Sequence, residues 1–169
     1  YRLQTRESST WYDEFRAQEA ELKAAPQRVG QKRADLLKSR LGEVLKKVRV
    51  AQGKDNVERR LTPIYDDVLP KDHDKNLYLW IQDGWQTEEK SVIAEAKAKS
   101  SDNPTLFAFL PAQHKTELTN VIVALEAART TLQKRGSPST EEGRDAQRSM
   151  ESRQRTAEKE LADLLEQLL

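Results

Sequence analysis

Two short apolar runs separated by a helical segment constrain the fold of this chain more than any other feature. The runs cover residues 77–81, which are rich in aromatic side chains, and residues 106–110. Each run is continuously apolar, which is typical of a strand buried on both faces of a parallel sheet. Acidic residues open the intervening segment, 87–101, as they often open a helix. The sequence therefore predicts a parallel strand–helix–strand unit.

Two strands form a poor sheet by themselves. We therefore expect a third strand from residues 56–70, or one that a partner chain supplies. The predicted fold class is α/β, with a small parallel βαβ unit of two or three strands flanked by long helices and ending in an antiparallel helical hairpin.

Long segments on both sides of this unit carry apolar residues at the three- and four-residue spacing of amphipathic helices. Glycines stand where helix ends are expected, with Gly53 after the second segment and Gly136 after the third. The spacing predicts helices over residues 10–23, 26–51, 112–135 and 140–169.

The start of the last helix has the pattern of a capping box. In this motif Ser139 would accept the third backbone N–H of the helix, and the Glu142 side chain would reach back to the backbone N–H of Ser139. Farther along, apolar residues repeat at seven, as in a coiled coil. This seam makes self-association through the terminal helix an open alternative. Its members are Met150, Ala157, Leu161, Leu164 and Leu168.

Composition limits the class of protein. Hydrophobic residues form 36% of the 169 residues and charged residues 34%, which is little core for a single compact globule. We predict three parts, with an N-terminal helical segment over 1–55, a small α/β core over 56–111 and a helical hairpin over 112–169. The absence of cysteine excludes disulfides and thiolate chemistry. No apolar run reaches the roughly 18 residues of a membrane span, and we expect a cytoplasmic protein without a membrane partner.

No catalytic residues and no metal ligands are predicted. The nearest match to a P-loop is Gly53-Lys54-Asp55, but Val48 stands where the first glycine is required and Asp55 replaces Ser or Thr. The two histidines lack partners at ligand spacing, and no Ser/His/Asp arrangement can be argued from spacing.

The N-terminal part is basic. The net charge of +1 conceals an excess of Lys and Arg in residues 1–60, which an acidic excess in residues 61–169 offsets. A cluster of cations here could contact the phosphates of DNA, or could simply form the solvated face of a helix. The candidate nucleic-acid-binding residues are Lys46, Lys47, Arg49, Lys54, Arg59 and Arg60.

Asp83 is a weak candidate for nucleotide or Mg²⁺ binding. It follows an apolar run as the acidic residue of a Walker B strand does, at the carboxyl end where parallel sheets bind ligands. The alternative is that Asp83 and Gly84 form a turn, in which the Asp side chain accepts backbone N–H groups.

Several segments together resemble the BrxC/PglY family, the large P-loop ATPases of BREX bacteriophage-resistance systems. They are Leu77-Tyr-Leu-Trp-Ile-Gln-Asp-Gly-Trp85, Pro104-Thr-Leu-Phe-Ala-Phe-Leu-Pro111, Glu126-Ala-Ala-Arg129, Arg135-Gly-Ser-Pro-Ser-Thr-Glu-Glu-Gly-Arg144 and Ser149-Met-Glu-Ser-Arg153. The resemblance covers roughly half of the chain, in the middle region of these bacterial proteins. Its signature residues are Asp83, Gly84, Trp85, Gly136 and Pro138.

The resemblance implies an internal module of an antiviral AAA-type ATPase. The parent protein would bind ATP and Mg²⁺ through a Walker A motif that this chain lacks, so no cofactor is expected here. The module would be structural or would mediate interactions without catalysis. Its partners would be the remainder of the ATPase, other BREX components and possibly DNA. The start at Tyr1 and the end within a helical run also fit an internal fragment.

Overall fold

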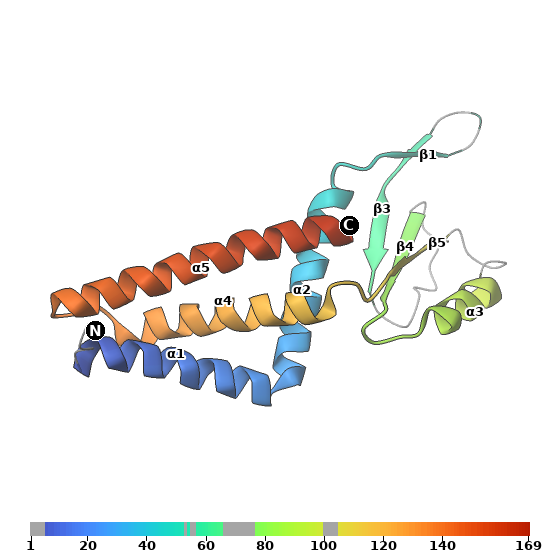
Figure 1. Cartoon of the computed structure of the whole chain (residues 1–169). Helices are drawn as coiled ribbons and strands as arrows, with labels where there is room; N and C mark the ends of the chain where they lie inside the picture. Colours follow the sequence, from blue (N-terminus) through green and yellow to red (C-terminus); the bar gives the residue numbers. More distant parts are fainter. Residues whose placement is uncertain (1–5, 53, 55–56, 66–76, 100–104) are drawn as a thin grey trace. The chain divides into compact units, whose positions relative to one another are not determined.

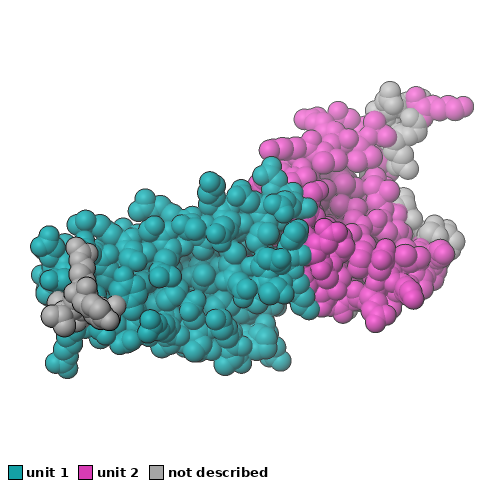
Figure 2. All heavy atoms as spheres, in the orientation of Figure 1, with its two compact units in different colours: residues 1–35, 114–167 teal, residues 36–113, 168–169 magenta. Residues whose placement is uncertain are grey.

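The computed structural model describes residues 6–52, 54, 57–65, 77–99 and 105–169, and their fold is α/β (Figure 1). The described elements, in chain order, are α1 (Arg6–Ala24), α2 (Pro26–Leu45), β1 (Val50–Gln52), β2 (Val57–Arg59), β3 (Leu61–Ile64), β4 (Leu77–Asp83), α3 (Glu89–Lys99), β5 (Thr105–Leu110), α4 (Lys115–Arg135) and α5 (Glu141–Leu168). They form two compact units, one of residues 1–35 with 114–167 and the other of residues 36–113 with 168–169 (Figure 2). The first unit thus combines the N-terminal residues with the C-terminal helices, although the two lie far apart in the sequence.

The second unit contains the predicted parallel sheet. Its strand order is β3-β4-β5, and both pairings are parallel. β3 supplies the expected third strand from residues 56–70. Trp80 of β4 is buried and meets Phe107 of β5 edge-on, with ring centroids 5.4 Å apart. The ammonium of Lys99 lies 5.0 Å from the Trp80 ring centroid, so α3 reaches the same face of the sheet.

The second helix is shorter than predicted. α2 ends at Leu45, and Val50 and Ala51, predicted as the end of this helix, belong to β1 (Val50–Gln52). Val48 donates to the carbonyl of Leu45 at 3.1 Å, a tight bond that closes the final turn. β-branched Val50 then enters a strand, because β2 offers it an antiparallel partner. Gly53, the predicted cap, lies outside the described residues.

The first unit is built around α1, α4 and α5, with α4 and α5 antiparallel as predicted (Figure 1). Alanines on α4 and α5 let the helices approach closely, and the large side chains of α1 and α5 fill the space between them. The buried core cluster is Trp11, Phe15, Ala127, Ala128, Ala146 and Met150.

The cap of α5 differs from the predicted capping box. Thr140, and not Ser139, accepts the backbone N–H of Gly143, at 3.0 Å. The backbone N–H groups of Ser139 and Thr140 donate instead to the carboxylate of Glu7 on α1, at 2.9 and 3.0 Å. A side chain from a distant helix therefore does what the local motif was expected to do.

The predicted seam of α5 is largely buried within this chain. Met150, Ala157 and Leu161 are buried, and Leu165 joins them while Leu164 is only half-buried. A straight helix advances by 3.6 residues per turn, so its buried stripe drifts away from a strict seven-residue repeat. Among the described residues, no helix combines the length and apolar character needed to cross a membrane.

Candidate anion-binding groove

The structure gathers basic side chains around an open groove of about 780 Å³ in the second unit. The cations that line it are Lys46, Arg49, Arg59 and Arg60, and Glu58 is the carboxylate in the same lining. Four of the six candidate residues thus meet at one concave surface. The remainder of the lining is Gly42, Leu45, Val48, Leu61, Thr62 and Pro63.

Two walls form the groove. One is the end of α2 with the turn that follows it, which carries Lys46. The other is the extended chain from β2 into β3, where Arg60 stands between the two strands. The carbonyl of Arg60 accepts the backbone N–H of Leu77 at 3.3 Å, which fixes this wall to β4. Arg59 ends β2, and the other three cations stand in the short segments that connect α2, β1, β2 and β3.

Tyr65 ties the two walls together. Its hydroxyl donates to the backbone carbonyl of Lys38 on α2 at 3.3 Å, and the Lys38 ammonium lies 5.3 Å from its ring centroid. Burial raises the pKa of Tyr65, so the hydroxyl stays protonated and able to donate at neutral pH. The end of β3 is therefore attached to the middle of α2.

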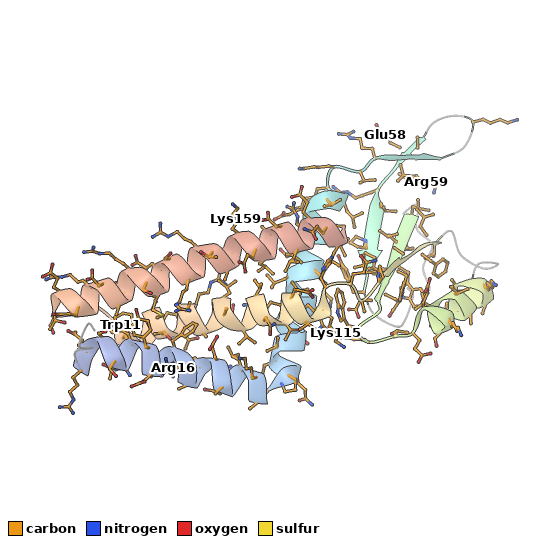
Figure 3. The ribbon with its side chains drawn as sticks, in the orientation of Figure 1. Trp11, Arg16, Glu58, Arg59, Lys115 and Lys159 are labelled. Carbon is orange, nitrogen blue, oxygen red and sulfur yellow. The ribbon has the colours of Figure 1, made fainter. Side chains whose placement is uncertain are left out.

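The lining of the groove combines basic and apolar side chains. Leu45, Leu61 and Pro63 are half-buried, whereas Lys46 and Arg60 are exposed. Arg49 and Glu58 form an ion pair at 3.1 Å, with most of each side chain in solvent (Figure 3 labels Glu58 and Arg59). An exposed pair of this kind contributes little to stability and separates easily. Arg49 is therefore able to exchange Glu58 for an incoming anion.

Two candidate residues lie outside the lining. Lys47 is in the turn after α2 and Lys54 in the β1–β2 connection, and both are exposed. Glu58 was not predicted as part of the site, because the pattern that marks this cluster in the sequence is one of positive charge. No pattern of neighbouring residues indicates it, because successive side chains of a strand point to opposite faces and Glu58 pairs with Arg49, nine positions away.

Asp83 occupies the predicted turn. Its Oδ1 atom accepts the backbone N–H groups of Trp85 at 3.2 Å and Gln86 at 3.0 Å. This geometry is that of the turn alternative, in which the carboxylate organises the chain after β4. Nucleotide or Mg²⁺ binding at Asp83 stays a prediction. Across the described ranges, no group of three His, Asp or Glu side chains is placed to hold a metal ion.

The signature glycines and proline have local structural roles. A Cβ at Gly84 would lie 2.9 Å from the backbone nitrogen of Ala112, so only glycine fits there without a shift. Gly136 ends α4 with a φ of 63°, a conformation that favours glycine. Pro138 packs against the first turn of α5. A Cβ added at Gly143 would lie only 2.8 Å from the Cβ of Pro138.

Comparison of the chain with protein-family models, curated proteins and solved structures finds no match. The function of the groove therefore has to be inferred from its own chemistry.

Proposed function

We propose that this chain is a non-catalytic binding module whose groove holds the phosphate backbone of a nucleic acid. The observation that carries the proposal is the convergence of Lys46, Arg49, Arg59 and Arg60 on one concave surface. Three of these four cations are arginines, whose planar guanidinium groups match phosphate oxygens with paired hydrogen bonds.

A solvated helix face, the alternative reading of this cluster, accounts less well for the arrangement. Lys46 lies in the turn after α2, Arg49 directly precedes β1, and the other two cations belong to the β2–β3 segment, so the four do not share one helix. Like charges repel, and Glu58 is the only carboxylate among the described lining residues to offset these four cations. A polyanion that binds several of them at once would remove that repulsion and release its own counterions.

The test is salt-dependent binding by charge-reversed variants. We expect Lys46→Glu with Arg60→Glu to weaken binding to DNA strongly, and Arg60→Ala to reduce the slope of log K against log salt by about 1. The matched control is Arg16→Glu with Lys159→Glu, which makes the same charge change at exposed positions on α1 and α5 (Figure 3).

Fluorescence anisotropy with labelled DNA measures both effects. Equal weakening by the groove variant and the control would show that only net charge matters, and would end the proposal. So would the absence of any binding by the native chain at low salt. Tight binding of polyglutamate with no binding of DNA would point to an acidic protein partner instead.

We also propose that this module belongs to a BREX-type phage-defence ATPase of the bacterial cytoplasm and docks onto the rest of that protein. The support is the resemblance stated above. Among the described residues, its segments cover β4 with the turn after it, β5, part of α4, the α4–α5 connection and part of α5. We expect the isolated chain neither to bind nor to hydrolyse ATP, and saturable turnover by the purified chain would contradict this. A parent gene without a Walker A motif or adjacent BREX genes would refute the family assignment.

A further inference from the structure

We infer that the carboxylate of Glu58 occupies the position of one backbone phosphate in the free chain, so that a nucleic acid displaces it from Arg49 on binding. This rests on the proposed function and adds a defined phosphate position and a residue that limits affinity. Three observations support it, namely the ion pair between the two side chains, its place in the groove lining and its exposure to solvent.

The carboxylate of Glu58 holds Arg49 as a phosphate would. Its Oε2 atom accepts a hydrogen bond from Nη1 of Arg49, and the two atoms are 3.1 Å apart. Carboxylates and phosphates both present negatively charged oxygens, and arginine binds both through the same guanidinium donors. The anion that Arg49 binds in the free chain is therefore part of the chain itself.

The pairing of β1 with β2 brings these two side chains together. Val50 lies opposite Arg59, and Ala51 lies opposite Glu58. Arg49 directly precedes Val50, so it stands on the diagonal to Glu58 across the two strands. Diagonal neighbours on one face lie within reach of long side chains. The register of two paired strands therefore sets the position of the carboxylate.

The pair can open without disturbing the core. The side chains of Arg49 and Glu58 are 79% and 67% exposed, so water solvates both charges once they separate. Exposed pairs of this kind contribute little to stability. Glu58 is also the only carboxylate among the described lining residues, where it stands beside four cations. It therefore opposes an incoming phosphate in two ways, by occupying Arg49 and by lowering the positive charge of the groove.

The experiment compares the native full chain with Glu58→Gln, which keeps the size of the side chain and removes its charge. Anisotropy titrations with labelled DNA at about 50 mM salt give both affinities. We expect Glu58→Gln to bind about two- to fivefold more tightly, the factor that corresponds to the loss of an exposed ion pair.

A matched control lies on α2. Glu43 pairs with Arg40 at 3.0 Å, is exposed like Glu58 and is not among the described lining residues. Glu43→Gln makes the same change of charge and should bind DNA like the native chain. In an Arg49→Ala background, Glu58→Gln should lose most of its effect, because no guanidinium remains there to be released.

Each outcome decides the point. If Glu58→Gln binds no more tightly than the native chain, while Lys46→Glu with Arg60→Glu still weakens binding, the role of Glu58 is refuted and the proposed function stands. Equal tightening by Glu43→Gln would show a general effect of charge and would also refute it, as would an undiminished gain in the Arg49→Ala background. If the native chain does not bind DNA at low salt, the proposed function fails as well.

Discussion

At the scale of single residues, Glu7 makes the most informative set of contacts. Its carboxylate accepts the backbone N–H groups of Ser139 and Thr140, and the hydroxyl groups of both residues also donate to it. These groups stand at the start of α5, where the helix dipole favours a negative charge. The hydrogen bonds from Thr140 and Ser139 lower the pKa of Glu7. Glu7 thus joins the start of α1 to the start of α5.

The first prediction concerns Glu7→Gln. A neutral amide has one carbonyl oxygen and a donating nitrogen, so it cannot accept the same set of hydrogen bonds. We expect a lower midpoint of thermal unfolding than in the native chain at pH 7. Because the pKa of Glu7 is lowered from 4.5 by folding, its contribution is complete above that value and is lost as the pH falls through the folded pKa.

The measurement is thermal unfolding followed by circular dichroism, repeated from pH 7 to below pH 4.5. The difference between the native chain and Glu7→Gln should shrink as the solution becomes acidic. Glu160→Gln, at an exposed position on α5, is the control and should unfold like the native chain. A difference that persists well below pH 4.5 would mean that the charge of Glu7 is not what stabilises the cap.

At the scale of helices, two glycines in the first unit have opposite surroundings. A Cβ at Gly30 in α2 would meet no atom within 4 Å. A Cβ at Gly143 in α5 would lie 2.7 Å from the carboxylate carbon of Glu7 and 2.8 Å from the Cβ of Pro138. Gly143 therefore makes room for the Glu7 cap, whereas Gly30 has no neighbour that excludes a side chain.

The second prediction is that the same substitution changes stability in opposite directions at these two positions. Gly30→Ala should stabilise the chain by about 0.5–1 kcal/mol, because alanine restricts the unfolded chain and favours helix. Gly143→Ala should destabilise it despite the same helix preference, since the new methyl group displaces Glu7. Urea unfolding of the two variants beside the native chain measures both signs, and stabilisation by Gly143→Ala would refute the steric account.

Most elements with strong local signals were predicted correctly, and features that depend on tertiary pairing were predicted less well. The continuous apolar runs predicted β4 and β5, and Gly136 marked the end of α4. β1 was missed because the helix was predicted to continue to residue 51, and only pairing with β2 makes residues 50–52 a strand. Four cations of the groove were predictable because they lie within 15 residues of one another. The contact of Glu7 with Ser139 spans 132 residues, and no local pattern indicates it.

At the scale of the whole molecule, the first unit depends on both ends of the chain. α1 packs on α4, and Trp11 joins Ala127, Ala128 and Met150 in one buried cluster. At the margin of this contact, Glu14 pairs with Lys134 at 3.1 Å and with Arg135 at 3.2 Å. Hydrogen bonds, chiefly from Lys134, lower the pKa of Glu14. The helix α1 therefore packs as a third helix against the hairpin of α4 and α5.

The last prediction tests this dependence with Trp11→Ala. Trp11 is 2% exposed, and removing its indole leaves a cavity between α1, α4 and α5. Substitutions of this type cost about 3–5 kcal/mol, so the first unit should unfold at a much lower urea concentration. Trp11→Phe, which keeps an aromatic ring in the cluster, should lose clearly less.

Two signals separate the units in this experiment. Circular dichroism follows α1, α4 and α5, which supply most of the helix in the described residues. The remaining tryptophans of the variant, Trp80 and Trp85, both belong to the second unit and report on it through fluorescence. A loss of helix at low urea, beside the smaller effect of Trp11→Phe, would support the role of α1 as a wall of the core. A circular dichroism midpoint like that of the native chain would contradict it, because a buried indole cannot be removed without cost from a core that depends on it.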